Sequence, residues 1–290
     1  AAANHTLLHF YSHPYAAPPP DAPTSLQQAW TALDFDPVHG VHRPNHSLAH
    51  AIRKALFVPM VVRAYARNYA PGAYFNDDPA PSTMTAQTFA SLTGRDVDAL
   101  QIALLFEVVG RESDIGHHDS QEIFAAFHAA SCRAFREYDA AGAALLDPEA
   151  KSRCLDALER MYMEPKNRAS LPYKCVLERC HDLDLYRCYD EQQMQDKQKL
   201  RIFTKELGGK AEAALELARL AEDAIRATGD RVMYSAVGRD PTGYDSVLFP
   251  LCSADPEECI RRVRAVLPEV AVAAKLENEE VSEGGGGGGD

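Results

Sequence analysis

Apolar residues recur at helical spacing along most of the chain, and the clearest stripe runs from Asp96 to Val109. Leu100, Ala103, Leu104 and Glu107 of this segment, together with Arg111 just beyond it, fall on one face at helical spacing. A second stripe follows Asp119, which forms an Asp-x-x-Glu capping pattern with Glu122. Its expected buried face is Ile123, Phe124, Phe127, Ser131 and Phe135. Both stretches predict amphipathic helices with one face in a core.

Similar patterns predict helices elsewhere. We expect them at residues 26–33, 44–69, 147–161, 171–187, 203–228 and 255–266. Pro59 lies inside the second of these, so we expect a kink or break near Val58. Gly208-Gly209 weakens the start of a long exposed helix at 203–228. Strand-like content on both sides of Pro241-Thr242-Gly243 is compatible with a small β-hairpin near the C-terminus. Helices dominate, so the predicted fold class is all-α.

Composition divides the chain into three parts. Residues 1–23 are a Pro-rich irregular segment, 24–268 a helical domain, and 269–290 a Gly-rich disordered tail. The formal net charge of −12 argues against a protein that coats nucleic acid or anionic lipid. No apolar run approaches the ~20 residues of a membrane span. We therefore expect neither nucleic acid nor membrane as a partner.

The cysteines indicate a reducing compartment. They are seven in number and contain no Cys-x-x-Cys pair, which predicts free thiols and a cytoplasmic location. Cys175, Cys180, His181 and Cys188 are an alternative zinc cluster, but their spacing matches no standard zinc module. The simpler interpretation is that these cysteines are small core side chains.

Histidines are concentrated in one short stretch. His39, His42, His46 and His50 lie within twelve positions. Pro44 suits a first helical turn, and His46, His50 and Arg53 then follow at i, i+4 and i+7 on one face. Imidazoles beside a guanidinium at a helix start suit an anionic, phosphate-like ligand.

Glu107 and His181 are further candidates for chemistry. A carboxylate on an apolar stripe needs a partner, either Arg111 one turn later or an imidazole from another helix. The first pairing is structural, whereas the second orients a catalytic histidine. His181 shares its helical face with Leu177 and Leu185, so we expect it to point inward. A single inward histidine is more often a core residue than a catalyst.

Two His-Asp dipeptides suggest an alternative. His117-His118-Asp119 and His181-Asp182 resemble the pairs used by metal-dependent phosphohydrolases of the HD superfamily. Asp119 has a simpler role as a helix cap, so we expect His117 and His118 at the surface. The chain has no Walker-type loop, no Gly-x-Ser-x-Gly elbow and no RNA-binding aromatic motif.

Three motifs resemble the phosphodiesterase domain of the SidE family of Legionella effectors. They are residues 42–50, 107–112 and 181–188, in the same order, and the resemblance spans residues 35–260. It implies a compact all-helical domain, distantly similar to HD-type phosphodiesterases, that needs no metal and no cofactor. It also implies that ubiquitin is the partner. The family splits ADP-ribosylated ubiquitin, releases AMP, and passes phosphoribosyl-ubiquitin to a serine of a substrate protein or to water. Standalone members release ubiquitin from such serines.

The resemblance also implies roles for individual residues. His42 or His46 attacks phosphorus, and we prefer His46 because it lies in the first helical turn. His181 is the general acid and then the general base, and Glu107 orients a histidine. The residues expected to hold phosphate oxygens are Arg111, Arg187, His50 and Arg43. Glu178 and Arg179, beside His181, are candidates for partner contacts.

The expected activity depends on His46, Glu107 and His181 converging on one anion-sized cavity. The sequence shows no mono-ADP-ribosyltransferase domain, so the protein receives its substrate, belongs to a longer protein, or acts as a hydrolase. The resemblance to translocated effectors also allows a location in a host cytosol. An HD-type metal-dependent nucleotide phosphohydrolase and a non-catalytic module that binds ubiquitin or nucleotide remain as alternatives.

Overall fold

The computed structural model describes a helical protein. The described residues are 46, 48–73, 83–111, 121–141, 146–161, 163, 165–189, 194, 198–229 and 256–267. Every regular element among them is a helix, which confirms the all-α class. The helix expected at 26–33, the hairpin, the tail, and His117, His118 and Asp119 lie outside the described residues.

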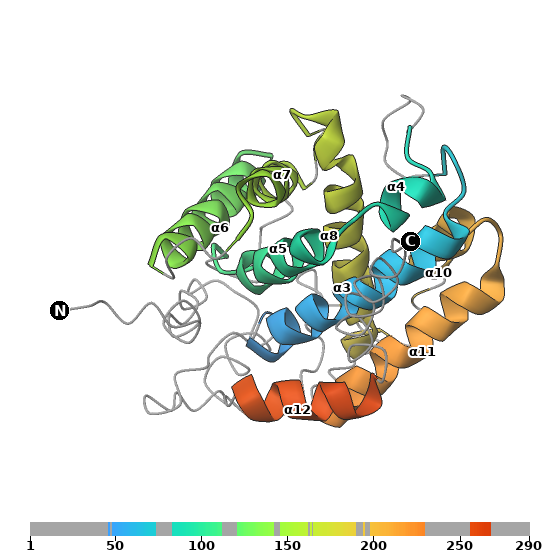
Figure 1. The fold of residues 1–290 in the computed structure, drawn as a ribbon. Coiled ribbons are helices and arrows are strands. Elements are labelled where there is room, and N and C mark those ends of the chain that lie inside the picture. The colour runs from blue at the N-terminus through green and yellow to red at the C-terminus, as the bar shows by residue number, and fades with distance from the viewer. Residues whose placement is uncertain are drawn as a thin grey trace, which may run out of the picture.

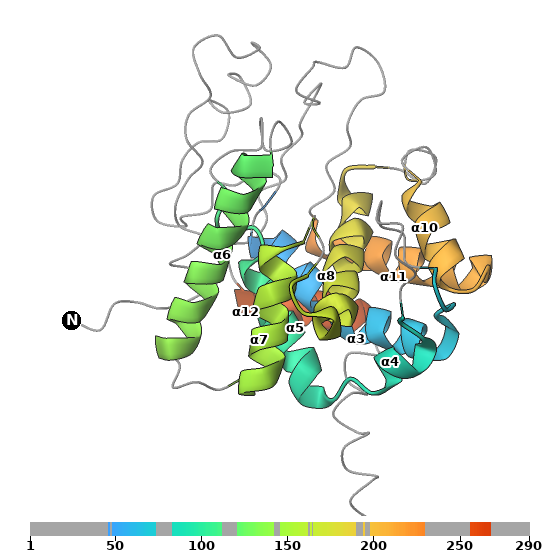
Figure 2. The same cartoon turned by 90° about the horizontal axis from the view of Figure 1, so that it is seen from above.

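Helix α3 (Leu48–Asn68) runs through the middle of the molecule (Figure 1). Five helices pack against it: α4 (Ala86–Ala90), α5 (Gly94–Phe106), α8 (Leu171–Asp184), α11 (Ala211–Thr228) and α12 (Pro256–Val266). Helices α6 (Gln121–Ala141) and α7 (Pro148–Glu159) lie side by side on one flank, and α10 (Lys199–Glu206) lies beside α11 on the other (Figure 2). Two 3-10 turns, η1 (Arg168–Ser170) and η2 (Leu185–Arg187), flank α8.

Apolar burial between these helices forms one continuous core. The inner face of α3 contributes Phe57, Val58, Val61 and Tyr65. Facing it are fully buried residues of α5, α8 and α11, namely Leu100, Ala103, Leu104, Val176, Leu177, Cys180, Ala221 and Ile225. Removal of this apolar area from water is the main force that holds α3 in the centre. No helix among the described residues is long and apolar enough to cross a membrane.

Two of the predicted helices differ from the structure. The helix around Pro59 is not broken, because α3 is continuous from Leu48 to Asn68. The helix predicted at 203–228 is two helices, α10 and α11, separated by Gly208 and Gly209 with φ values of +69° and +78°. Glycine adopts this left-handed conformation without the steric cost of a Cβ, so the pair ends α10 rather than merely weakening one helix. Helix α11 is exposed on one side only, since Ala214, Leu217 and Ala221 are among its buried residues.

The ends of α5 determine where Glu107 lies. Thr93 and Asp96 form a reciprocal capping box, in which the Thr93 amide donates to Asp96 Oδ2 at 2.7 Å. The helix therefore begins at Gly94, two residues before the predicted start. It ends at Phe106, so Glu107 lies just beyond the last helical residue, in a turn that extends to Gly110.

Helix α6 holds that turn in place. Ser131 Oγ donates to the Glu107 carbonyl at 2.8 Å and accepts from the Gly110 amide at 3.0 Å. Gly110 is packed so closely that an added Cβ would lie 2.3 Å from the Phe127 carbonyl oxygen and 2.9 Å from Ala130 Cβ. The turn that carries Glu107 therefore requires glycine at position 110.

We predict that Gly110→Ala lowers the free energy of unfolding by about 3 kcal/mol, because the contacted backbone cannot move aside cheaply. Gly209→Ala is the control. It meets no atom within 4 Å, so only its positive φ should cost about 1 kcal/mol. Urea unfolding monitored by circular dichroism measures both variants. Equal stability losses would show that the α5–α6 contact tolerates a methyl group.

Candidate active site

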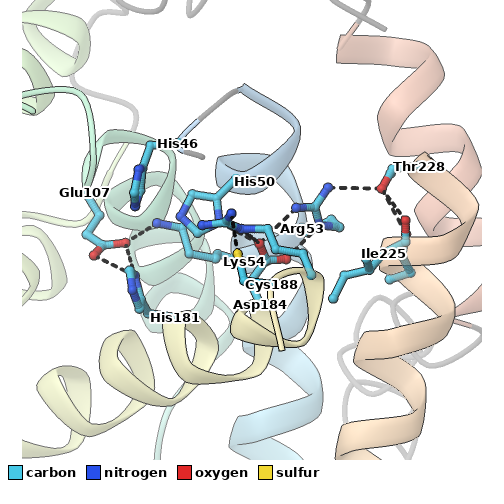
Figure 3. A network of polar contacts seen from close by, with 12 residues as sticks. His46, His50, Arg53, Lys54, Glu107, His181, Asp184, Cys188, Ile225 and Thr228 are labelled. Carbon is cyan, nitrogen blue, oxygen red and sulfur yellow. Dashed lines mark hydrogen bonds and ion pairs between the residues drawn. The ribbon is translucent and has the colours of Figure 1, made fainter. Parts of the chain in front are cut away.

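Three separate segments bring charged and imidazole side chains to one place (Figure 3). His46 and the first turns of α3 supply one side. The turn after α5 supplies Glu107 and Arg111. The last turns of α8, together with η2, supply His181, Asp184 and Arg187. The three segments that the sequence predicted to carry these groups therefore meet, because α5 and α8 both pack against α3.

Three histidine rings form a row. The ring centroids of His46 and His50 are 5.2 Å apart, and those of His50 and His181 are 5.6 Å apart. Consecutive rings are nearly perpendicular, at 89° and 87°. His46 and His50 are buried, whereas the side chain of His181 remains 17% exposed. The expected convergence of His46 and His181 is thus present, with His50 between them.

Glu107 is buried and is held from two sides. It accepts from Lys54 Nζ through Oε2, and His181 Nδ1 lies 3.1 Å from its Oε1. Of the two partners proposed from the sequence, the imidazole of another helix is present. Arg111, the other candidate, donates from a guanidinium nitrogen to His46 Nε2. Glu107 therefore connects α5 to both α3 and α8.

The surroundings of Glu107 strongly favour its ionised form. Burial alone would raise the pKa of Glu107, but the Lys54 ammonium and His181 together hold it well below its usual range. Burial lowers the pKa of Lys54, while the adjoining carboxylate favours its charged form. Glu107 and Lys54 thus form a buried ammonium–carboxylate ion pair.

Asp184 organises a second cluster beside the first. Its carboxylate accepts from His50 Nδ1 at 2.6 Å and from two nitrogens of Arg53 at 2.6 and 2.9 Å. Arg187 Nε donates to it at 3.1 Å, and another nitrogen of Arg53 reaches Thr228 Oγ1 of α11 at 3.0 Å. Five side chains from three helices and η2 are joined in this way.

His50 is neutral in this cluster. Burial, reinforced by the charges of Lys54 and Arg187, holds its pKa well below the ordinary value. The negative charge of Asp184 is already matched by two guanidinium groups, so a further positive charge on His50 is disfavoured. A neutral His50 that donates from Nδ1 carries its lone pair on Nε2.

His128 of α6 also lies close to the site. It is buried, and its pKa is lowered to about 4, first by burial. The charge of Glu107 opposes this shift, whereas His181, Arg111 and Lys54 reinforce it. Sequence reasoning missed this residue, although it neighbours Phe127 on the predicted buried face of its helix.

Lys54 and Asp184 were also missed, and spacing could have found them. Lys54 follows His50 by four residues, which places both on one side of α3. Asp184 lies three residues from both His181 and Arg187.

Other predicted site residues lie elsewhere or outside the described part. His42 and Arg43 are not among the described residues. Arg179 is buried, and its guanidinium binds both oxygens of Glu206 at 2.8 and 2.9 Å and Asp182 at 2.8 Å. The neighbouring Glu178 is 13% exposed. In this position Arg179 joins α8 to α10, which leaves little of it for a partner to contact.

A possible metal-ligand set emerges, but not at the cysteines. Cys175, Cys180 and Cys188 are buried free thiols. In the described part of the chain, the grouping with metal-binding geometry is His50, Glu107 and His181, whose ligand atoms lie within 4.8 Å of one another. The simpler interpretation of the cysteines as core side chains agrees with their burial.

The arrangement combines the parts that phosphoryl chemistry requires. Imidazoles provide nucleophilic and proton-transferring nitrogens, a carboxylate orients one of them, and Arg111 adds positive charge beside another. Water is largely excluded from the buried members, which strengthens their electrostatic interactions.

Comparisons with known proteins agree with this chemistry. The model of the SidE phosphodiesterase (PDE) domain matches residues 26–233. A crystal structure of lpg1496 determined under 300 MPa is 27% identical, with a TM-score of 0.61, covering 90% of this chain and 94% of that one. We found no match among curated proteins.

Two further solved structures come from Legionella pneumophila. The C-terminal domain of lpg1496 in complex with nucleotide is 26% identical, with a TM-score of 0.60, over 91% of this chain and 96% of that one. A longer chain, described as uncharacterized protein lpg1496, is 26% identical with a TM-score of 0.59. That match covers 89% of this chain but only 65% of the other, so this chain spans less than two thirds of it.

We predict that Asp184→Asn lowers the free energy of unfolding by about 3–5 kcal/mol, because Arg53 and Arg187 would remain buried without a matching negative charge. Asp139→Asn is the control, since Asp139 is also buried but its carboxylate pairs with Lys151, which is partly exposed. Thermal and urea unfolding measure both. A loss at Asp184 no larger than at Asp139 would contradict the central role of Asp184.

We also predict that His128 makes stability depend on pH. The unfolded chain takes up a proton near pH 6.5, whereas the folded chain does so only near pH 4, so stability falls as the pH is lowered between these values. Lowering the pH from 7 to 5 should therefore reduce the free energy of unfolding by about 2 kcal/mol through His128. Urea unfolding of wild type and His128→Gln at both pH values tests this, because His50 affects the two proteins alike. Identical pH dependence in the two proteins would refute the prediction.

Proposed function

This chain belongs to the SidE phosphodiesterase domain family, which implies phosphodiesterase activity, and we propose that its substrate is phosphoribosyl- or ADP-ribosyl-ubiquitin. The reaction would be cleavage of the phosphodiester or pyrophosphate bond, with transfer to water or to a serine of a substrate protein. The observation that carries the proposal is the meeting of His46, Glu107 and His181 from three separate segments.

His181 is the proposed general acid. Glu107 accepts from its Nδ1, which orients the ring and leaves Nε2 to face the leaving group. Its partial exposure suits a group that must reach a substrate carried by another protein. Glu107 also stabilises the positive charge that His181 carries before it gives up its proton.

His46 is the proposed nucleophile, with His42 as the alternative. The contact of Arg111 with His46 Nε2 indicates that this nitrogen holds a lone pair. An incoming phosphate would draw the guanidinium onto its own oxygens and leave the lone pair directed at phosphorus. Arg111 would then stabilise charge on the phosphoryl oxygens.

The proposed reaction has two steps. In the first, a histidine nitrogen forms a bond to phosphorus, the bond to the leaving oxygen of AMP or of serine breaks, and His181 protonates that oxygen. In the second, water or a serine hydroxyl attacks phosphorus and gives its proton to His181, and the nitrogen–phosphorus bond breaks. No metal ion is needed in this scheme.

The remaining phosphate-binding candidates play different parts in the proposal. Arg43 would contact phosphate oxygens directly. Arg187 and His50 are bonded to Asp184, so they would influence the reaction mainly from fixed positions beside the reacting groups, and less by binding phosphate oxygens. Glu178 and Arg179 remain proposed partner contacts, with Glu178 the more accessible of the two.

Two further aspects rest on similarity. The lpg1496 domain complex with nucleotide supports AMP as a product that this site would release. The Legionella relatives support the proposal that the protein acts as a translocated effector in a host cytosol, where ubiquitin is present.

We predict that the protein releases AMP from ADP-ribosylated ubiquitin and that His181→Ala lowers the rate by about 100-fold or more, because the leaving oxygen loses its acid. Intact-mass analysis of ubiquitin, ADP-ribosyl-ubiquitin and a serine-linked conjugate distinguishes hydrolysis from transfer. His46→Ala and His42→Ala, assayed for a phosphorylated enzyme intermediate, identify the nucleophile. Arg226→Ala, an exposed change on α11, is the control.

Unchanged turnover in a folded His181→Ala protein would refute the assignment. The His50–Glu107–His181 grouping favours one other function, an HD-type metal-dependent nucleotide phosphohydrolase. Activity that a chelator abolishes and Mn²⁺ restores would support that function. Binding of ubiquitin or nucleotide without turnover of any candidate substrate would indicate a non-catalytic module.

A further inference from the structure

The strongest observation not used by the proposed mechanism is the buried cation at its centre. Lys54 is fully buried, and its ammonium binds Glu107, the same carboxylate that orients His181. Figure 3 shows Lys54 reaching from α3 toward Glu107 between His50 and His181. A lysine in this position lies among groups that otherwise resemble metal ligands.

The neighbouring groups satisfy the chemistry of a divalent cation. Two imidazoles and one carboxylate are a common ligand set for Zn²⁺, Fe²⁺ and related ions, which bind nitrogen and oxygen at about 2.0–2.2 Å. The ligand atoms of His50, Glu107 and His181 lie within 4.8 Å of one another, so small side-chain shifts would let all three reach one ion. The fold thus brings three potential ligand side chains within reach of one ion.

The lysine opposes occupation of that site in two ways. Its ammonium binds Oε2 of Glu107, one of the two oxygens that this carboxylate could offer to an ion. Its positive charge would also lie a few ångströms from a dication in a site with little water to screen them. Arg53, its neighbour in sequence, is already bound to Asp184 and adds further positive charge nearby.

We propose that Lys54 is the resident cation of this site, which takes the place of a divalent metal and blocks a latent metal site formed by His50, Glu107 and His181. The inference deepens the proposed function, because a fixed ammonium would supply positive charge near the phosphoryl group without a metal. Lys54 contacts Glu107 and not the reacting atoms, so its charge would act on His181 through that carboxylate, as a positioning residue. Its effect on metal binding can be measured without any substrate.

The experiment is a titration of the untagged chain with Co²⁺, monitored by visible absorption and calorimetry. The proteins are wild type, Lys54→Met and Lys174→Met. Lys174 is an equally buried lysine that pairs with Glu178 on α8, away from the imidazole row, so it is a matched control. We expect Lys54→Met to bind one Co²⁺ at this site with an affinity roughly 100-fold higher than that of wild type. Lys174→Met should behave as wild type.

A double variant locates the ion. Adding His181→Ala to Lys54→Met should remove the additional Co²⁺, whereas metal bound elsewhere, including by the histidines at 39–46, should be unaffected. Binding of Co²⁺ by wild type that disappears in His181→Ala would overturn the proposal. So would a folded Lys54→Met protein with no additional ion.

Folding is controlled separately, because Lys54→Met leaves Glu107 buried without its ammonium. Lys54→Gln keeps a hydrogen-bond donor and removes the charge. If neither variant folds alone, refolding in Co²⁺ must yield a folded protein with the additional ion, and failure to do so would overturn the proposal. If Lys54→Met binds Co²⁺ as expected but the wild-type protein does not cleave ADP-ribosyl-ubiquitin, the proposed function would be refuted. This inference would still stand.

Discussion

Charge neutralisation of two buried carboxylates by the central helix is the constraint on which the structure depends. Asp184 and Glu107 come from different segments, and α3 answers each with an adjacent cation, Arg53 and Lys54. A buried charge without a partner is too costly to persist, so α5 and α8 can dock on α3 only where both pairs form. Apolar burial drives the helices together, and these two ion pairs fix the positions of α5 and α8 along α3.

The same constraint prepares the site for chemistry. Because Asp184 is already matched by guanidinium groups, His50 stays neutral beside it. Because Lys54 keeps Glu107 ionised, that carboxylate can orient His181. The contact between the Glu107–Gly110 turn and Ser131 of α6 adds a third support from a helix outside the charged clusters. The interactions that stabilise the fold and those that position the imidazoles are therefore largely the same.

Local patterns predicted much of this architecture. The helix predicted at 147–161 and the stripe that buries Leu100 and Leu104 are present as expected. Gly208-Gly209 ends a helix, whereas the sequence predicted only a weakened start. Composition shows that glycine disfavours a helix, but it does not show that the chain turns at that point. The helix does not break at Pro59, since packing on both sides of α3 outweighs one missing backbone hydrogen bond.

For the site, the sequence by itself identified the reactive residue types and the helical faces that carry them: His46 and His50 on one face, Glu107 on an apolar stripe, and His181 pointing inward. Spacing along a helix is a local property, so it can be read from a single segment. Which groups pair was decided only by the tertiary structure. Glu107 meets Lys54 and His181, Arg111 meets His46, and Asp184 gathers His50, Arg53 and Arg187. These partners lie between 53 and 134 positions apart wherever they join different helices, and packing around α3, which no local pattern encodes, determines which of them meet.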